Sequence, residues 1–417
     1  MIDYLNKRVK INPEKIFIEY KNQSISFNQF NNIINNLNLT AKNSQAKYIG
    51  LQVKNKLKLI SAIIALNRQN KIPIIYPNYP NVEDYISTTK VKITFTDKNI
   101  TLNTQDNINN NYINYNSHST QIVIFTSGTT GQPKACELTY DNVYKSSIKW
   151  NKVLKFNHND IYLNHMPLTH VSGLCIFFRA LHHNFKMILE DFEPANYFNY
   201  IMKNNITLIS MVPSMLQKII NYNSKIHYTD NLKAIILGGS KMSTNIFNII
   251  KQHKIPAYIS YGMSETTSGI AGFWYNQDSP NHYKSHEGVN ITLYQSQIMI
   301  NSDTVMKRYL YDQSLNNKFI SHDIGRIYSN KTFIIKKRKN SVSNYGGESL
   351  SLDYINKHIE SYDIVSQCKL KIVKDNLWGE VLHAYVKLNK NIDSELLLKK
   401  IKKNLPKHMI PKKIIKQ

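Results

Sequence analysis

The chain has 417 residues, which exceeds the size at which single hydrophobic cores stop growing, so we expect at least two domains. Its composition, 42% hydrophobic and 19% charged, is typical of a globular protein, and no apolar run approaches the roughly 18 residues that a membrane-spanning helix needs. The first residues lack the pattern of a secretory signal. Three separated cysteines without metal-binding spacing predict reduced thiols: Cys136, Cys175 and Cys368.

The formal charge of +25 raises the possibility of nucleic-acid binding through counterion release. However, lysine, asparagine, isoleucine and tyrosine are abundant along the whole chain, as in 107–115, which favours mutational drift toward AT-rich codons over a basic binding surface. We therefore expect neither a nucleic-acid partner nor a membrane, with homo-oligomers left open. The expected compartment is a bacterial cytoplasm, or the plastid stroma if the gene is organellar.

Short apolar runs alternate with longer amphipathic stretches, a pattern typical of an α/β protein with mostly parallel sheets. Five runs predict buried strands: 47–53, 72–76, 121–125, 206–212 and 232–237. Between the last two, residues 213–221 carry apolar side chains at helical spacing and predict a crossover helix. Ligands are expected at the carboxyl ends of such strands.

After about residue 290 the pattern changes to strand-like alternation, as in 297–301 and 332–336. A basic run at 336–339 then precedes a predicted helix at 352–361 and a strand at 382–388. We predict an α/β fold with a large N-terminal domain, 1–337, whose mostly parallel sheets are flanked by helices. A small, mobile α+β C-terminal domain is predicted at 338–417.

The strongest motif is Thr126-Ser-Gly-Thr-Thr-Gly-Gln-Pro-Lys134, directly after the strand at 121–125. Glycines let backbone N–H groups approach an anion, hydroxyls add donors, and the lysine supplies a positive charge, so the motif predicts a polyphosphate loop. Pro133 distinguishes it from the P-loop of kinases and GTPases. Six residues of the loop are expected to bind nucleotide: Thr126, Ser127, Gly128, Thr129, Thr130 and Gly131.

This loop resembles the signature of the acyl-adenylate-forming superfamily, which includes acyl-CoA synthetases, firefly luciferase and peptide-synthetase adenylation domains. The segment Tyr261-Gly-Met-Ser-Glu-Thr266 resembles the superfamily's aromatic-Gly-x-Thr-Glu motif. The resemblance implies that Tyr261 packs on adenine, Glu265 holds Mg²⁺, and Thr266 touches the α-phosphate. It also implies that Lys134 and Glu265 are catalytic and that ATP, Mg²⁺ and coenzyme A are required.

Three further matches follow in the superfamily's order. The segment His322-Asp323-Ile-Gly325 resembles the motif whose aspartate binds the ribose hydroxyls, and Arg338 matches the hinge arginine that also reaches the ribose. The segment Tyr345-Gly-Gly-Glu348 resembles the loop that lines the pantetheine tunnel, which implies a CoA role for Gly346 and Gly347. Each match is weak singly, but their shared order makes coincidence improbable.

Within the superfamily the chain looks most similar to the o-succinylbenzoate-CoA ligases of menaquinone and phylloquinone synthesis. Three stretches carry this similarity: 165–179, 235–240 and 259–268. They imply a catalytic His170, with a core histidine as the alternative, backbone contacts to adenine and acid from Gly238 and Gly239, and acid contacts from Ser240 and Gly262.

Arg179 is the candidate for substrate selection. It lies in the apolar run 174–181, where an arginine needs an anionic partner because an unpaired buried charge is costly. Either the substrate's aromatic carboxylate or a protein carboxylate, Glu190 or Asp191, could supply that partner.

Two positions depart from the superfamily. The hinge aspartate is replaced by Ser341, and the sequence reaches Gln417 before the usual catalytic lysine, so we expect a truncated small domain. Lys412, Lys413 or Lys416 are candidate substitutes. The predicted function is ATP-dependent formation of 2-succinylbenzoyl-CoA through an acyl-adenylate. The alternatives are a ligase for another aromatic or fatty acid, and a degenerate nucleotide-binding relative.

Overall fold

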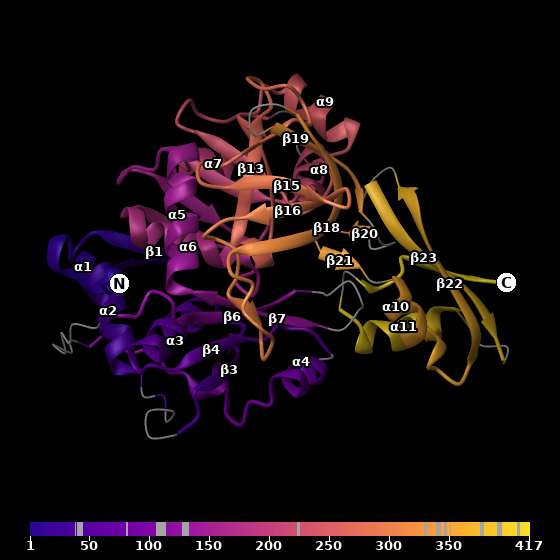
Figure 1. The fold of residues 1–417 in the computed structure, drawn as a ribbon, viewed down its shortest axis with the longest axis horizontal. Helices are drawn as coiled ribbons and strands as arrows, with labels where there is room; N and C mark the ends of the chain where they lie inside the picture. Colours follow the sequence, from indigo (N-terminus) through magenta and orange to yellow (C-terminus); the bar gives the residue numbers. More distant parts are fainter. Residues whose placement is uncertain are drawn as a thin grey trace.

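The fold contains two large mixed sheets, surrounded by helices, and a smaller C-terminal unit (Figure 1). It is known from a computed structural model. The model describes residues 1–37, 39, 45–80, 82–105, 114–126, 133–222, 226–328, 332–338, 343–345, 348–350, 352–375, 379–389, 394–406 and 409–417. Within these ranges no helix combines the length and apolarity needed to cross a bilayer.

The first sheet has six strands in the order β17-β7-β6-β4-β3-β5. Its parallel part confirms three predicted strands and adds a short fourth: β3 (Tyr48–Gln52), β4 (Ile72–Ile75), β6 (Thr120–Thr126) and β5 (Thr94–Thr96). Strand β7 (Lys134–Thr139) returns antiparallel to β6, and the two-residue β17 (Arg308–Tyr309) pairs with β7. The sheet edge is thus completed by a segment distant in sequence.

The second sheet has thirteen strands in the order β15-β16-β18-β19-β14-β13-β12-β11-β10-β8-β9-β1-β2. A parallel run contains the predicted strands β10 (Leu208–Met211) and β11 (Ala234–Leu237), with β1 (Ile16–Tyr20), β8 (Ile161–Asn164), β9 (Lys186–Leu189) and β12 (Ala257–Met263). Antiparallel strands extend both edges: β2 (Gln23–Ser26), β13 (Ser268–Trp274), β14 (Tyr283–Ser285), β15 (Asn290–Tyr294), β16 (Gln297–Asn301), β18 (Lys318–Ile327) and β19 (Thr332–Arg338).

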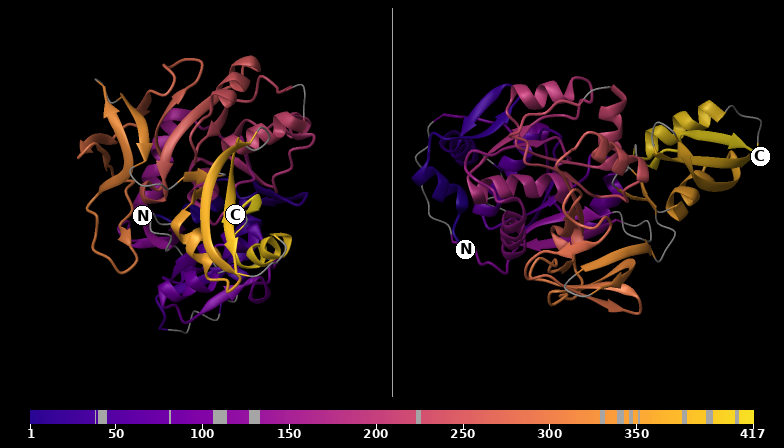
Figure 2. Two further views of the ribbon diagram at one scale, coloured as in Figure 1. Left: turned by 90° about the vertical axis from the view of Figure 1, so that its right-hand side faces the viewer. Right: turned by 90° about the horizontal axis from the view of Figure 1, so that it is seen from above.

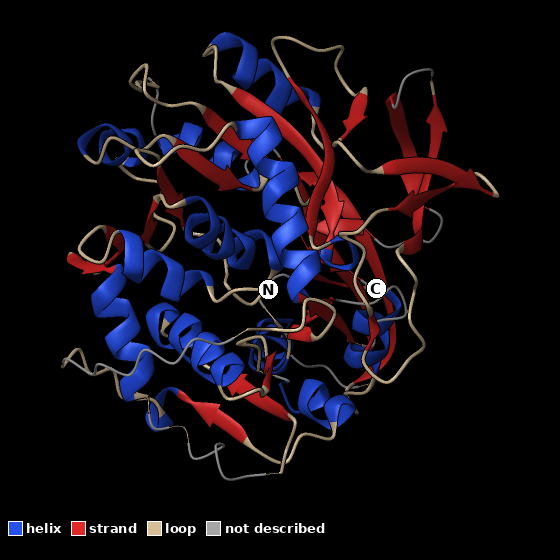
Figure 3. Ribbon diagram, turned by 60° about the vertical axis from the view of Figure 1, so that its left-hand side comes forward, coloured by secondary structure: helices blue, strands red, loops and turns tan. Residues whose placement is uncertain are grey.

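Helices surround the strands of the two large sheets (Figure 3). From β13 to β19 the described chain consists mainly of strands. The helices are α1 (Tyr4–Ile11), α2 (Phe27–Asn36), α3 (Lys56–Arg68), α4 (Val82–Thr89), α5 (Tyr140–Leu154), α6 (Val171–His183), α7 (Tyr197–Lys203), α8 (Pro213–Tyr222) and α9 (Thr244–Gln252). Helix α8 confirms the predicted crossover helix. Capping boxes begin α2 at Ser26 and α5 at Thr139, because a hydroxyl there satisfies an otherwise unpaired backbone N–H.

One buried cluster joins the two sheets. It combines apolar side chains of α3 and α6 with those of strands from both sheets, including Ile63, Phe177, Leu51 and Leu189. Burial of this size is the main favourable term in folding. The two sheets therefore share a core and hold the elements between them in fixed positions.

The C-terminal unit forms a separate lobe at one end of the molecule (Figures 1 and 2). It contains a two-stranded hairpin, β20 (Ser343–Tyr345) and β21 (Glu348–Leu350), and a three-stranded sheet, β22 (Val365–Asp375), β23 (Gly379–Leu388) and β24 (Lys413–Lys416). Helices α10 (Leu352–Glu360) and α11 (Ser394–Asn404) pack on this sheet around a core of its own. The predicted small α+β domain is confirmed, while its boundary at 337/338 stays a prediction.

Candidate active site

A cavity of about 1090 Å³ opens at the carboxyl ends of the parallel strands. Its wall includes the end of β6, the residues after β8 and β11, and the ends of β10 and β12. This is the position at which open α/β sheets bind ligands. Ten residues predicted from the sequence line it: Thr126, His170, Arg179, Gly238, Gly239, Ser240, Tyr261, Gly262, Asp323 and Arg338.

The predicted phosphate loop is a hairpin connection between β6 and β7. Its two ends, Thr126 and Lys134, are paired in register across these antiparallel strands. The central residues Ser127, Gly128, Thr129, Thr130 and Gly131 lie outside the described residues, so their roles stay predictions. The register nevertheless brings Lys134 beside Thr126, which lines the cavity, although Lys134 itself is not among the lining residues.

Lys134 and Glu265 approach the same side chain, Tyr309 of β17. The Tyr309 hydroxyl donates to Glu265 Oε1 over 2.8 Å, and Lys134 Nζ lies 5.0 Å from the centroid of the Tyr309 ring. Glu265 is only 9% exposed, and no ion pair to it occurs among the described residues. Because a buried carboxylate is costly without a cation, this site fits a bound metal ion.

No cluster of three or more His, Cys, Asp or Glu side chains that could enclose a metal occurs within the described ranges. Mg²⁺ does not need one, because it commonly binds through one or two carboxylates together with substrate phosphates and water. Glu265, which shares Tyr309 with Lys134 at the end of the predicted phosphate loop, matches that donor set. Thr266 is buried, and its hydroxyl hydrogen-bonds to the backbone of Met263. The same hydroxyl donates to the Ser268 carbonyl over 2.8 Å. The contact of Thr266 with the α-phosphate therefore stays a prediction.

The three predicted nucleoside residues converge. The Tyr261 hydroxyl donates to Asp323 Oδ2 over 2.8 Å, and Arg338 Nε lies 3.7 Å from Asp323 Oδ1. Asp323 and Arg338 are direct neighbours across β18 and β19. The Asp323 amide donates to Ser321 Oγ over 3.2 Å, so this serine supports the aspartate locally. Burial, reinforced by Asp323, raises the pKa of Tyr261 well above its usual value and keeps its hydroxyl a donor.

The glycines shape the wall beside these residues. Gly239 has φ of +80°, a conformation that side chains rarely tolerate. A Cβ at Gly262 would lie 2.2 Å from the Ser268 carbonyl oxygen, so β12 and β13 can approach closely only with glycine there. Gly238, Gly239 and Ser240 follow β11 and present backbone to the cavity.

Arg179 lies on α6 with 2% exposure and still lines the cavity. Its Nη2 donates to Ser268 Oγ over 2.7 Å, and its Cζ lies 4.6 Å from the centroid of the Trp150 ring. In the described part of the chain no carboxylate pairs with it, and Arg179 Nε and Trp150 Nε1 have no hydrogen-bond acceptor. A partly satisfied, buried cation at a cavity wall fits an anionic ligand group.

The alternative partners predicted for Arg179 are wrong. Lys56 of α3 forms an ion pair with Asp191 at 2.9 Å and donates to the backbone carbonyl of Glu190. A lysine from another helix therefore pairs with the Asp191 carboxylate, and no ion pair joins Arg179 to Glu190 or Asp191 within the described residues.

His170 is half-buried at the cavity wall and is not a core histidine. It is the residue before α6, and its Nε2 lies 3.4 Å from the Tyr79 hydroxyl. Its catalytic role stays a prediction. The cavity also includes residues that the sequence analysis missed, among them Trp150, Ser268, Ser260, Tyr79, Tyr85 and Phe247.

The CoA-binding prediction cannot be followed to the site, because Gly346 and Gly347 lie outside the described residues, as does the hinge residue Ser341. The three candidate lysines lie in the C-terminal unit, none of them at the cavity wall. Lys412 Nζ pairs with Asp375 Oδ2 at 2.6 Å, while Lys413 and Lys416 are exposed on β24.

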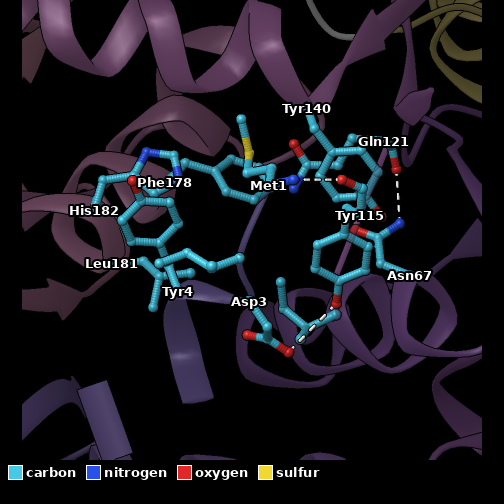
Figure 4. Close-up of a pocket in the computed structure, with 12 residues that line it drawn as sticks. Met1, Asp3, Tyr4, Asn67, Tyr115, Gln121, Tyr140, Phe178, Leu181 and His182 are labelled. Carbon is cyan, nitrogen blue, oxygen red and sulfur yellow. Dashed lines mark hydrogen bonds between the residues drawn. The ribbon is translucent and has the colours of Figure 1, made fainter. Parts of the chain in front are cut away.

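A second cavity, of about 30 Å³, lies beneath the N-terminus (Figure 4). There the Met1 amino group donates to the Tyr115 carbonyl over 2.5 Å, and Asn67 Nδ2 donates to the Gln121 carbonyl over 2.8 Å. A space of this volume suits water and not a substrate.

A model of the AMP-binding enzyme family matches residues 5–308. The chain belongs to this family. AMP-binding enzymes similar to it include 2-succinylbenzoate–CoA ligases from Geobacillus sp. (strain WCH70), 28% identical over 319 residues, and from Staphylococcus aureus (strain JH9), 28% identical over 313 residues. Each alignment covers 70% of this chain, but the chain spans only 64% and 62% of the two ligases' lengths.

Solved structures of AMP-binding enzymes share the fold. The o-succinylbenzoate CoA synthetase (MenE) from Bacillus subtilis, a double mutant bound with its product analogue OSB-NCoA, has a TM-score of 0.87 at 20% identity, covering 100% of this chain and 95% of that one. The same synthetase in complex with ATP and magnesium has a TM-score of 0.72 at 20% identity, covering 100% and 96%. The match extends beyond the family model to the C-terminal unit.

Proposed function

We propose that this chain is an ATP-dependent ligase that converts 2-succinylbenzoate and coenzyme A into 2-succinylbenzoyl-CoA through an acyl-adenylate. The substrate assignment rests on Arg179, a buried cation that pairs with no protein carboxylate among the described residues. It lies at the wall of the cavity that the predicted ribose residues also line. 2-Succinylbenzoate has two carboxylates, so one can pair with Arg179 while the other reacts. The names of the relatives support the same acid.

In the first step, an oxygen of the aliphatic carboxylate attacks the α-phosphorus of ATP, the bond to the bridging oxygen breaks, and pyrophosphate leaves. Asp323 accepts the ribose hydroxyls, and Tyr261 and Arg338 hold that aspartate in place. Lys134 offsets the phosphate charge that develops in the transition state. Mg²⁺ held by Glu265 would supply further charge neutralisation at the phosphates.

In the second step, the CoA thiolate attacks the acyl carbonyl and AMP leaves. The hairpin β20–β21 carries the segment that resembles the pantetheine loop, and we infer that a movement of the C-terminal unit brings it to the cavity. Arg338, the last residue of β19, would be the turning point.

Mass spectrometry of CoA thioesters formed from a mixed panel of acids with ATP and Mg²⁺ tests this function. We expect 2-succinylbenzoyl-CoA as the main product. A preference for monocarboxylic aromatic or fatty acids would support the proposed adenylation chemistry but refute 2-succinylbenzoate as the substrate. The absence of any thioester, together with tight nucleotide binding, would indicate a degenerate binding protein.

Several finer features stay predictions within this proposal. These are the pathway, menaquinone or phylloquinone synthesis, and the compartment, a bacterial cytoplasm or a plastid stroma. The roles of Gly346, Gly347 and His170, an oligomeric state, and the absence of a nucleic-acid partner belong with them.

A further inference from the structure

Residues 304–310, here called the bridging segment, connect the turn that carries Glu265 to the strand that begins with Lys134. Thr267 Oγ1 donates to the Thr304 carbonyl, and the Met306 amide donates to the Glu265 carbonyl, both over 2.8 Å. At its other end the bridging segment pairs with β7, where the Leu310 amide donates to the Ala135 carbonyl over 2.7 Å. One short segment thus fixes the backbone beside both charged residues.

Tyr309 extends this connection to the side chains. Its hydroxyl donates to Glu265 Oε1 over 2.8 Å, and its ring faces Lys134 Nζ at 5.0 Å from the centroid. An ionised carboxylate can only accept hydrogen bonds, so the Tyr309 hydroxyl is the donor. The position of this hydroxyl determines which of the two Glu265 oxygens accepts the hydrogen bond. The second oxygen, Oε2, has no hydrogen bond to a described residue.

We propose that Tyr309 is a positioning residue for adenylate formation, which rests on the proposed function. By holding Glu265 Oε1, Tyr309 presents Oε2 to Mg²⁺ with its geometry already set. Its ring attracts the Lys134 ammonium by a cation–π contact and holds it beside the residue that orients Glu265. Outer partners of this kind orient metal ligands and affect metal affinity, although they do not touch the metal.

The test compares Tyr309→Phe with the matched control Tyr48→Phe. Tyr48 of β3 donates to Glu137 Oε1 of β7, the strand that begins with Lys134, over 3.2 Å, and within the described residues it has no hydrogen bond to Glu265 or Lys134. Calorimetry measures the Mg²⁺ dependence of ATP binding. Single-turnover assays measure pyrophosphate release from acid and MgATP, and thioester formation from synthetic 2-succinylbenzoyl-AMP and CoA.

For Tyr309→Phe we expect the Mg²⁺ concentration that gives half of the full Mg²⁺ effect on ATP affinity to rise about 10-fold. The rate of adenylation should fall by about 10- to 100-fold. Thioester formation from the synthetic adenylate should stay within about 2-fold of wild type, because that step needs neither group. Tyr48→Phe should leave all three quantities unchanged. Tyr309→Leu, which also removes the ring, should weaken ATP binding without Mg²⁺ more than Tyr309→Phe does.

A Tyr309→Phe variant with wild-type Mg²⁺ dependence and adenylation would refute the proposal. A parallel fall of both half-reactions and of the melting temperature would refute it too, since that result indicates a structural role. If wild type makes no adenylate from any acid, the proposed function fails, but the Mg²⁺ dependence of ATP binding still decides the role of Tyr309.

Discussion

The guanidinium of Arg179 lies against the indole ring of Trp150, with 4.6 Å between Cζ and the ring centroid. The contact stabilises the cation without neutralising it, because an aromatic face attracts positive charge but carries none. Arg179 therefore keeps its charge for a ligand.

Arg179→Leu should raise the KM for 2-succinylbenzoate by the equivalent of about 1–3 kcal/mol, because a charged hydrogen-bonded contact is lost. The KM for ATP should not change, since the proposed nucleoside-binding residues Tyr261, Asp323 and Arg338 have no hydrogen bond to this arginine within the described residues. Steady-state kinetics with each substrate varied in turn checks both values. An unchanged KM for the acid with a lower melting temperature would assign Arg179 a structural role.

Ser268→Ala should have a smaller effect in the same direction. Its hydroxyl accepts from Arg179 Nη2 over 2.7 Å, so its loss frees the guanidinium to reorient. We expect the KM for 2-succinylbenzoate to rise by the equivalent of about 0.5–1.5 kcal/mol. Ser147→Ala, which removes a buried serine of α5 that does not line the cavity, is the control. Equal effects of the two substitutions would argue against an orienting role for Ser268.

Lys134→Ala and Glu265→Ala should each slow adenylation by about 100-fold or more, the usual loss when one preorganised charge is removed from a transition state. Both variants should remain folded, as measured by circular dichroism. Wild-type pyrophosphate release in either variant would contradict the assignment of these residues.

Asp323→Asn should raise the KM for ATP by about 10-fold or more, because the amide cannot accept two ribose hydroxyls and pair with Arg338 as a carboxylate does. Asp303→Asn disrupts a comparable ion pair, 3.0 Å from Lys149, outside the cavity lining. It should leave the KM for ATP unchanged. A larger ATP effect for Asp303→Asn would place the ribose site elsewhere.

Stability should fall as the pH drops from about 6.5 toward 3, because burial, together with the positive charges of nearby His183 and Arg8, lowers the pKa of His182 to about 3. The folded state holds this imidazole neutral, so the folded state has its full stability above the unfolded pKa of about 6.5. Below that pH the unfolded chain takes up a proton that the folded chain does not, and the free energy of unfolding falls. At pH 5 the loss from His182 is about 2 kcal/mol.

In the wild-type protein, His182 Nδ1 pairs with Ser147 Oγ at 2.9 Å. The asparagine of His182→Asn keeps a polar group near Ser147, but this side chain does not titrate. Denaturant unfolding at pH 7 and pH 5 should show a smaller stability loss for this variant than for wild type. Equal losses would mean that His182 is already protonated or already solvent-accessible in the folded protein.

The parallel strands were predictable because a strand buried on both faces is nearly continuously apolar, as 122–125 and 234–237 are. The phosphate loop could be proposed from the sequence because its motif is contiguous, and its role in binding phosphate stays a prediction. Tyr309 was not predictable, because β17 has two residues and no periodic pattern, and its contacts are with residues 44 and 175 positions away. Only tertiary pairing with β7 brings it to the site.

Ser268 was missed, and the protein carboxylates suggested as partners of Arg179 were wrong, for related reasons. Ser268 has φ of +111°, which a non-glycine residue rarely adopts and which no local sequence signal predicts. Proximity in sequence suggested Glu190 or Asp191 as the partner of Arg179, but Lys56, more than a hundred positions away, binds Asp191 instead. Competition among charges from different helices is decided by the three-dimensional fold.

Arg338 is the last residue of β19 and also the ion-pair partner of Asp323. The chain leaves the large sheet at that residue and continues into the C-terminal lobe. A nucleotide whose ribose competes for Asp323 therefore acts on the residue that anchors the lobe. Such coupling is reciprocal, because whatever shifts one equilibrium must shift the other by the same free energy. A crosslink that held the lobe in one orientation would thus change the affinity for AMP, even though it touched no part of the nucleotide.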